Sequence, residues 1–97
     1  MKELPNIHPG EVLQEEFLKP MGISAYRLAK KIRLPQTRIS EIFRGKRRIA
    51  ADTALHMAKF FGITPQFWLG LQDDYDFEEQ QEKLADELAG IETMYAS

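Results

Sequence analysis

Apolar side chains recur at intervals of three and four residues along most of the chain, which is the spacing of one buried helix face. This spacing predicts five helices, over residues 9–18, 25–32, 36–44, 52–61 and from 65 onward. The apolar positions that define the first four are Val12, Leu13, Phe17, Leu18, Leu28, Ala29, Ile32, Ile39, Ile42, Phe43, Ala54, Leu55, Ala58 and Phe61. No stretch alternates between apolar and polar residues as a half-buried strand does, so the pattern predicts an all-α fold.

Residues with strong preferences for helix ends bound these segments. Ser24 and Asp52 have the short polar side chains that cap helix N-termini, and Thr64 is placed to cap the fifth helix. Pro35 suits the start of the third helix. Pro20 is expected to stop the first helix, because a proline inside a helix lacks an N–H group and clashes with the preceding turn.

The last third of the chain combines many acidic residues with one narrow apolar stripe. Leu84, Leu88, Ile91 and Tyr95 follow a four-three-four spacing, which predicts a further helix with Gly90 as its weak point. An isolated helix of this length is marginal in water, so the stripe needs a surface that covers it. We expect a five-helix domain over residues 1–76 and an acidic, helical extension over residues 77–97.

The composition narrows the class of protein. The 97 residues suit one domain, and 43% of them are hydrophobic and 29% charged, as in ordinary globular proteins. No apolar run approaches the roughly 18 residues of a membrane span, and no secretory signal is expected at the N-terminus. The chain has no cysteine, which excludes disulfides and thiolate metal sites. We expect a cytoplasmic protein that does not bind a membrane.

The charge of the chain is divided unevenly. Residues 1–64 carry 12 basic and 6 acidic side chains, whereas residues 65–97 carry 1 basic and 9 acidic ones, so the net charge of −2 conceals two opposite parts. Residues 27–48 alone hold nine basic side chains and a single acidic one, Glu41. Such a concentration of positive charge is typical of a surface that binds a polyanion.

The predicted helix over residues 36–44 follows the one over residues 25–32 after a short connection, as in a helix-turn-helix motif. On a helical wheel, the side opposite Ile39 and Ile42 carries hydroxyl groups, an arginine and a carboxylate, which are groups that read base edges in the major groove of DNA. The candidate base-reading residues are Gln36, Thr37, Arg38, Ser40, Glu41 and Arg44.

A second set of residues is suited to phosphate contacts. Lys46, Arg47 and Arg48 come just after that helix, where a loop would run beside the wall of the groove. Ser24 and Tyr26 lie at the N-terminus of the preceding helix, and helix N-termini favour anions. Ser24 is equally suited to simple capping, and the two roles are compatible. The helix is therefore predicted to specify the sequence, while the loop positions the protein on the duplex.

The chain resembles the HigA-type (VapI-like) antitoxins, a branch of the phage-repressor-like helix-turn-helix superfamily, in the runs HPGEVLQEEFLKPMGIS, LAKKIRLPQTRISEIFRGKRRIAADTALHMAKFFG and PQFWLGLQDDYD. The resemblance implies a dimeric repressor of its own operon that binds double-stranded operator DNA. It also implies that the protein neutralises a HigB-type toxin, a ribosome-dependent mRNA interferase, and it implies no cofactor. Arg33 stands where such turns often have glycine, so we expect a turn that is not strictly left-handed.

Two further surfaces are expected beyond residue 64. Phe67, Trp68 and Leu71 lie in an almost wholly apolar stretch with more large side chains than so small a domain readily hides, and we predict a homodimer interface there. The acidic last third of the chain, residues 65–97 with a net charge of −8, is the part best suited to attract a basic toxin.

Other classes of function remain to be weighed against an antitoxin. An enzyme is not expected, because His8 and His56 are far apart in the sequence and no nucleophile or phosphate-loop motif accompanies them. His8 is expected to act locally beside Pro9, and His56 to be an exposed or partly packed helix residue. A stand-alone repressor without a toxin would carry the same DNA-binding residues, so the sequence leaves it open. A helical protein-interaction module without nucleic-acid affinity is the third alternative.

Overall fold

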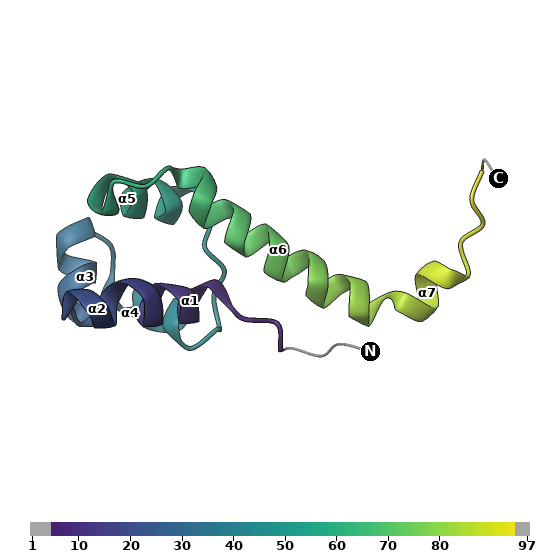
Figure 1. Cartoon of the computed structure of the whole chain (residues 1–97), viewed down its shortest axis with the longest axis horizontal. Coiled ribbons are helices and arrows are strands. Elements are labelled where there is room, and N and C mark those ends of the chain that lie inside the picture. Colours follow the sequence, from purple (N-terminus) through teal and green to yellow (C-terminus); the bar gives the residue numbers. More distant parts are fainter. Residues whose placement is uncertain (1–4, 95–97) are drawn as a thin grey trace.

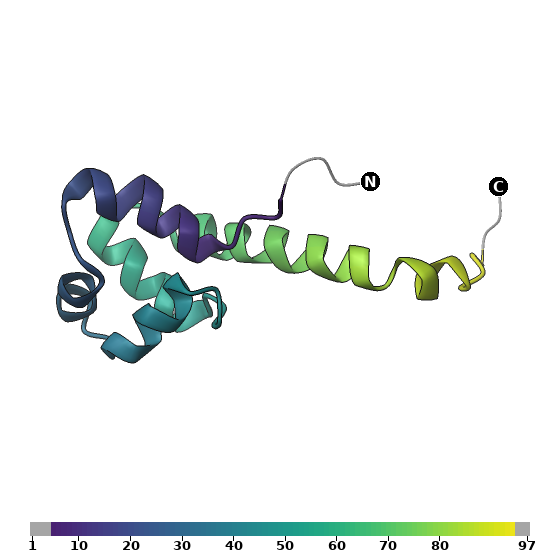
Figure 2. The ribbon, with the colours of Figure 1, turned by 90° about the horizontal axis from the view of Figure 1, so that it is seen from below.

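All the regular elements of the computed structural model, which describes residues 5–94, are helical (Figure 1). They are α1 (Pro9–Val12), η1 (Leu13–Leu18), α2 (Lys19–Met21), α3 (Ala25–Ile32), α4 (Gln36–Phe43), α5 (Ala51–Phe61), α6 (Pro65–Lys83) and α7 (Ala85–Ala89). Figures 1 and 2 show a cluster formed by the elements up to α5, with α6 projecting from it and α7 at the far end. The prediction of an all-α helix-turn-helix fold with a helical extension is confirmed.

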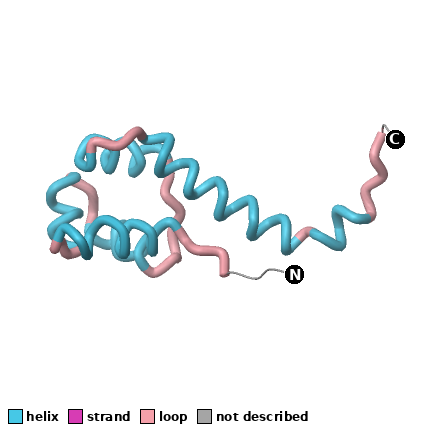
Figure 3. The backbone as a smooth tube through the Cα atoms, in the orientation of Figure 1, coloured by secondary structure: helices cyan, strands magenta, loops and turns pink. Residues whose placement is uncertain are grey.

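The first helical segment is longer than predicted, because Pro20 does not stop it. The segment runs through α1, η1 and α2 as one helical stretch (Figure 3). Gly22, with a φ of 67°, ends it. Its middle part, η1, is π-helical, and the N–H of Lys19 bonds to the carbonyl of Gln14, five residues back. In a regular α-helix the ring of Pro20 would meet the carbonyl of Glu16, and the wider turn gives the ring room.

The core lies where the helices of the cluster meet. Its buried apolar residues are Leu13, Leu18, Leu28, Ala29, Ile32, Ile39, Ile42, Ile49, Ala54, Met57 and Trp68. The prediction that Leu55 belongs to this core is wrong, since its side chain is 59% exposed. The face of α5 that packs inward carries Ala54 and Met57, and Leu55 lies one residue beyond that face.

The start of α5 also differs from the prediction. The N-cap position is Ala50, and Asp52 lies inside the first turn. The Oδ1 atom of Asp52 accepts a hydrogen bond of 2.8 Å from the N–H of Thr53, its direct neighbour, so the carboxylate still serves the N-terminal end of the helix. Its other oxygen is thereby left to bind a side chain of another helix.

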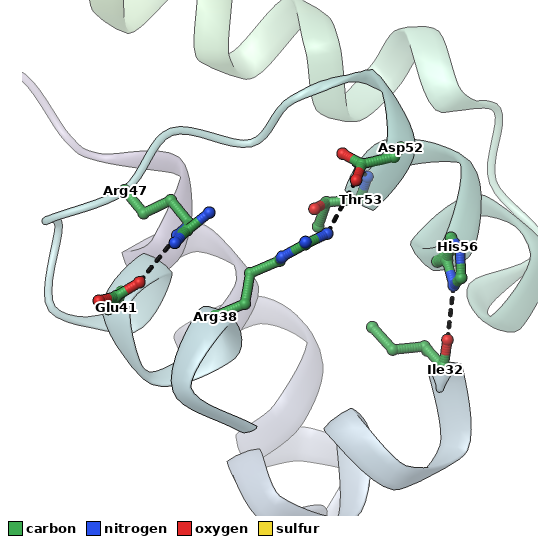
Figure 4. Close-up of polar contacts among 7 residues, drawn as sticks. All are labelled: Ile32, Arg38, Glu41, Arg47, Asp52, Thr53 and His56. Carbon is green, nitrogen blue, oxygen red and sulfur yellow. Dashed lines mark hydrogen bonds and ion pairs between the residues drawn. The ribbon is translucent and has the colours of Figure 1, made fainter. Parts of the chain in front are cut away.

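The turn of the helix-turn-helix is left-handed, contrary to the expectation for Arg33. Arg33 has φ 60° and ψ 44° and follows the last residue of α3. Its strain is offset by the closed end of the helix, where the N–H of Leu34 bonds to the carbonyl of Ala29 at 3.0 Å. His56 of α5 adds a contact of 2.6 Å between its Nδ1 and the carbonyl oxygen of Ile32 (Figure 4). Tertiary structure therefore holds a conformation for which glycine would be the usual residue.

The acidic extension is helical and shares α6 with the rest of the fold. α6 continues without a break through residue 76, and α7 ends at Gly90, the predicted weak point. Leu88 and Ile91 of the apolar stripe are exposed, Leu84 is partly buried, and Tyr95 lies outside the described residues. Within residues 5–94, no helix is long and apolar enough to cross a membrane.

Candidate nucleic-acid interface

One face of α4 gathers five of the six predicted base-reading side chains. Ile39 and Ile42 are fully buried and fix the inner face of the helix. The opposite face borders an open hollow of about 550 Å³. The hollow is lined by Gln36, Thr37, Ser40, Glu41, Phe43 and Arg44. Hydroxyl, amide, carboxylate and guanidinium groups thus share one surface, which is the set that reads base edges in a major groove.

Arg38, the sixth candidate, binds a neighbouring helix. Its Nη1 atom donates a hydrogen bond of 2.8 Å to Oδ2 of Asp52 at the start of α5 (Figure 4). The hydrogen bond from the N–H of Thr53 lowers the pKa of Asp52 most, and the bond from Arg38 lowers it further. Asp52 is therefore an anion at neutral pH and orients Arg38, so a base contact by Arg38 requires the guanidinium to leave this partner or to share it.

The loop after α4 presents the predicted phosphate-binding cations. Lys46, Arg47 and Arg48 are all exposed. Arg47 turns back onto α4, where its Nε donates to Oε1 of Glu41 at 2.8 Å (Figure 4). This ion pair joins a candidate base-reading residue to a candidate phosphate-binding residue, and it partly neutralises both when no duplex is bound.

Arg48 is held by a carboxylate of α6. Its Nη2 donates to Oδ2 of Asp76 at 2.8 Å, and the other carboxylate oxygen accepts from Nε2 of Gln72 at 2.9 Å. Burial by itself raises the pKa of Asp76, but the hydrogen bonds from Arg48 and Gln72 and the charges of Arg48 and His8 outweigh it and hold the pKa below its ordinary value. Asp76 is thus an anion at neutral pH.

The N-terminus of α3 carries the remaining phosphate candidates. Ser24 is the N-cap, and its Oγ accepts from the N–H of Arg27 at 3.2 Å, which confirms the capping role. Tyr26 is exposed, and the Nζ of Lys30 lies 5.3 Å from the centre of its ring. With Arg27 and Lys31, these two side chains border a second open hollow. The cations beside Tyr26 make this end of α3 electropositive.

Two residues of α5 fix the angle between the helices of the motif. Asp52 holds α4 through Arg38, and His56 holds α3 through the carbonyl of Ile32 (Figure 4). Since a carbonyl only accepts, Nδ1 of His56 is the donor in this pair. The local pattern predicts neither role, because both partners are distant in the sequence. His8 acts locally as expected, with its Nδ1 accepting from the N–H of Gly10 at 2.9 Å.

The three predicted dimer residues differ in how far their side chains are exposed. Trp68 is 0% exposed and packs in its own chain against Phe17, Phe61 and Phe67, so it does not form part of an exposed surface. Phe67 is 38% exposed, and Leu71 is partly buried. The aromatic cluster around Trp68 accounts for the apolar start of α6 and leaves Phe67 and Leu71 as surface candidates.

Within residues 5–94, no three His, Cys, Asp or Glu side chains are grouped so that they could hold a metal ion. The polar side chains of the interface instead form pairs of opposite charge between a cation of the helix-turn-helix region and a single carboxylate. Arg44 and Lys46 of the same surface are also exposed.

Comparison with known proteins places the chain in a well-defined group. Residues 15–68 match the helix-turn-helix family. Virulence-associated protein I of Dichelobacter nodosus is 53% identical over 76 residues, which cover 78% of this chain and 70% of that protein. An addiction module antidote protein of the HigA family from Coxiella burnetii is 46% identical, with a TM-score of 0.88 over 95% of this chain and 100% of that one. The Pseudomonas aeruginosa antitoxin HigA, solved with the higBA promoter, is 32% identical, with a TM-score of 0.90 over 94% of this chain and 100% of that one.

Proposed function

The chain belongs to the HigA family of helix-turn-helix antitoxins, and we propose that it represses its own operon as a homodimer and neutralises a HigB-type toxin. The observation that carries the DNA-binding part is the grouping of polar side chains on the outer face of α4, beside an exposed basic loop. The likeness to a HigA protein solved with promoter DNA supports the same use of this surface.

On the duplex, α4 enters the major groove and its outer face reads the bases. Gln36, Thr37, Ser40, Glu41 and Arg44 make the direct contacts, and Arg38 joins them by exchanging or sharing its bond to Asp52. The phosphate contacts come from Ser24, Tyr26, Lys46, Arg47 and Arg48. When Arg47 binds a phosphate, its ion pair with Glu41 breaks, and Glu41 becomes free to contact a base.

The part of the chain beyond residue 64 serves the protein partners. Phe67 and Leu71 of α6 contribute to the dimer surface, while Trp68 supports them from the core. The acidic extension attracts the toxin, and its exposed stripe at Leu88 and Ile91 supplies apolar contacts. Negative charge and exposed apolar side chains close together, on α7 and just after it, suit a basic protein partner.

The antitoxin function is tested with the protein encoded beside this chain. Co-expression should restore growth that the neighbouring protein alone arrests, and the two should purify together. A neighbouring protein that neither inhibits growth nor binds the chain contradicts the toxin-neutralising part. Specific operator binding would then leave a stand-alone repressor, and loss of all duplex affinity at low salt would leave a protein-interaction module.

A further inference from the structure

A buried carboxamide on α6 is bonded to the loop that carries the phosphate-binding cations. Gln72 is only 1% exposed, which is unusual for a glutamine and requires that its polar atoms be satisfied. Its Oε1 accepts from the main-chain N–H of Ile49 at 2.6 Å, and its Nε2 donates to Asp76 at 2.9 Å. The side chain thus uses both ends of its amide.

The same network extends to a charged side chain of the loop. Asp76 accepts from Gln72 with Oδ1 and from Arg48 with Oδ2. The loop between α4 and α5 is therefore attached to α6 at two adjacent residues, through the main chain of Ile49 and the side chain of Arg48. Ile49 itself is fully buried, so its side chain and main chain anchor the end of the loop together.

The attachment leaves Arg48 able to bind a further anion. A guanidinium has five N–H donors. Arg48 donates to Asp76 through Nη2, and its side chain is 56% exposed. Because the guanidinium is planar, a carboxylate bonded to one of its edges fixes the direction of its remaining N–H donors. Such support lowers the entropy lost when the cation meets a phosphate.

We infer that Gln72 and Asp76 are positioning residues for DNA binding, which hold the basic loop, and Arg48 in particular, in the conformation that meets the phosphate backbone. The inference rests on the proposed function, because it takes the loop to be a phosphate-contacting element. It assigns a role to the Gln-x-x-Tyr-Asp part of α6, which lies on the helix that also carries the dimer candidates. The geometry of α6 is thereby tied to the affinity for the operator.

The direction in which one substitution changes the affinity for DNA distinguishes a positioning role from simple electrostatics. Asp76→Asn removes a negative charge near the DNA, so charge alone predicts tighter binding. Positioning predicts the reverse: on the order of tenfold weaker binding to every duplex, and a log K against log salt slope that is shallower by about two per dimer. Asp74→Asn is the matched control, because Asp74 is exposed on the same helix, and it should bind as tightly as the wild type or slightly tighter.

A second pair of variants tests the carboxamide. Gln72→Met should weaken binding and flatten the salt slope as Asp76→Asn does, whereas Gln81→Met, on the exposed part of α6, should change neither. The salt slope of the folded fraction is insensitive to a mere loss of stability, and circular dichroism at the assay temperature measures that fraction. The double variant Gln72→Met, Arg48→Ala should lose no more operator affinity than the weaker-binding of the two single variants, because Gln72 acts through the position of Arg48.

The outcomes distinguish this role from the proposed function. If Arg48→Ala weakens binding while Asp76→Asn and Gln72→Met bind with wild-type affinity and slope, the positioning role is overturned and the DNA-binding function stands. Tighter binding by Asp76→Asn also overturns it. A wild-type protein without affinity for its operator overturns the proposed function, and the positioning role falls with it.

Discussion

Gly10 of α1 lies against the main-chain carbonyl of Ile42 in α4, so closely that a Cβ atom at Gly10 would overlap the carbonyl group. This contact sets the distance between the N-terminal segment and the helix that carries the base-reading candidates. The neighbouring atom belongs to the backbone, and a side chain at position 10 cannot be accommodated by a rotamer change.

Gly10→Ala should therefore destabilise the protein by about 1–3 kcal/mol, since α1 or α4 must shift to make room. The matched control is Gly70→Ala in α6, where an added Cβ meets nothing within 4 Å. That substitution should stabilise the protein by up to about 1 kcal/mol through helix propensity. Urea unfolding at one fixed protein concentration measures both, and equal effects of the two substitutions would contradict the packing described for Gly10.

Replacing Arg33 with glycine should change the stability in the direction opposite to Gly10→Ala. Arg33 occupies a left-handed conformation that costs a residue with a side chain about 1 kcal/mol, so Arg33→Gly should leave stability unchanged or raise it by up to about that amount. Arg27→Gly, within α3, should instead lower stability by about 1 kcal/mol. A similar loss for both variants in thermal unfolding would show that the turn is not strained.

Stability should fall in mildly acidic solution because of His8. Burial lowers the pKa of His8, while the charge of Asp76 opposes this, and the neutral Nδ1 is the acceptor that caps α1. With a folded pKa below the ordinary value near 6.5, the unfolded chain binds the proton more readily, so the free energy of unfolding decreases as the pH falls from about 6.5 toward the folded pKa. Urea titrations between pH 7.5 and 5 measure this decrease.

His8→Asn keeps an acceptor at the cap but does not titrate in this range. Its free energy of unfolding should depend less on pH than that of the wild type, and the difference between the two curves isolates His8 from other groups. Parallel curves for the two proteins would mean that His8 does not carry the dependence.

The periodicity of apolar residues located α3, α4 and α5 closely, because their inner faces are regular and short loops separate them. The expectations drawn from single residues are wrong at Pro20 and Arg33, where a wider helical turn and the contact from His56 compensate for unfavourable local conformations. Such compensation comes from residues elsewhere in the chain or from a change of helix type, and neither is visible in the local pattern.

The candidate site was predictable in its residue types but not in its pairings. The wheel of α4 correctly grouped Thr37, Ser40, Glu41 and Arg44 on one face, since helix geometry alone determines that grouping. The partners of Arg38 and Arg48 are 14 and 28 residues away in the sequence, and only the tertiary fold brings them together. Trp68 was misplaced on a surface because a uniformly apolar stretch does not indicate which of its faces is buried.

Arg44 and Lys46 should differ in what their removal does to DNA recognition. Arg44→Ala should weaken the free energy of operator binding by roughly 1–3 kcal/mol per half-site and relax discrimination at particular bases, because it removes a contact between α4 and the bases. Lys46→Ala should weaken all duplexes alike and make the salt slope shallower by about one per lost phosphate contact. Competition assays with operator variants at several salt concentrations measure both quantities, and altered base preference in Lys46→Ala alone would invert the assignment.

Truncation after Asp76 should separate the roles of α6 and the acidic extension. The shortened chain retains Phe67, Leu71 and the network at Gln72, so it should remain dimeric and bind operator DNA, while its binding to the toxin should weaken. Sedimentation, operator titration and toxin co-purification measure the three properties. A monomeric product would assign the extension to the dimer, and unchanged toxin binding would remove its proposed role.

A footprint of the purified protein on the DNA upstream of its own operon tests most directly whether it is a dimeric operator-binding repressor. A dimer that inserts two α4 helices predicts protection of a near-palindrome whose half-sites lie about 34 Å apart, with a salt slope of about −7 if roughly eight phosphates are neutralised. Arg44→Ala should lose the protection at specific bases. Protection of a single asymmetric half-site, or uniform coating of any duplex without a preferred sequence, would show that the protein is not a dimeric, sequence-specific repressor.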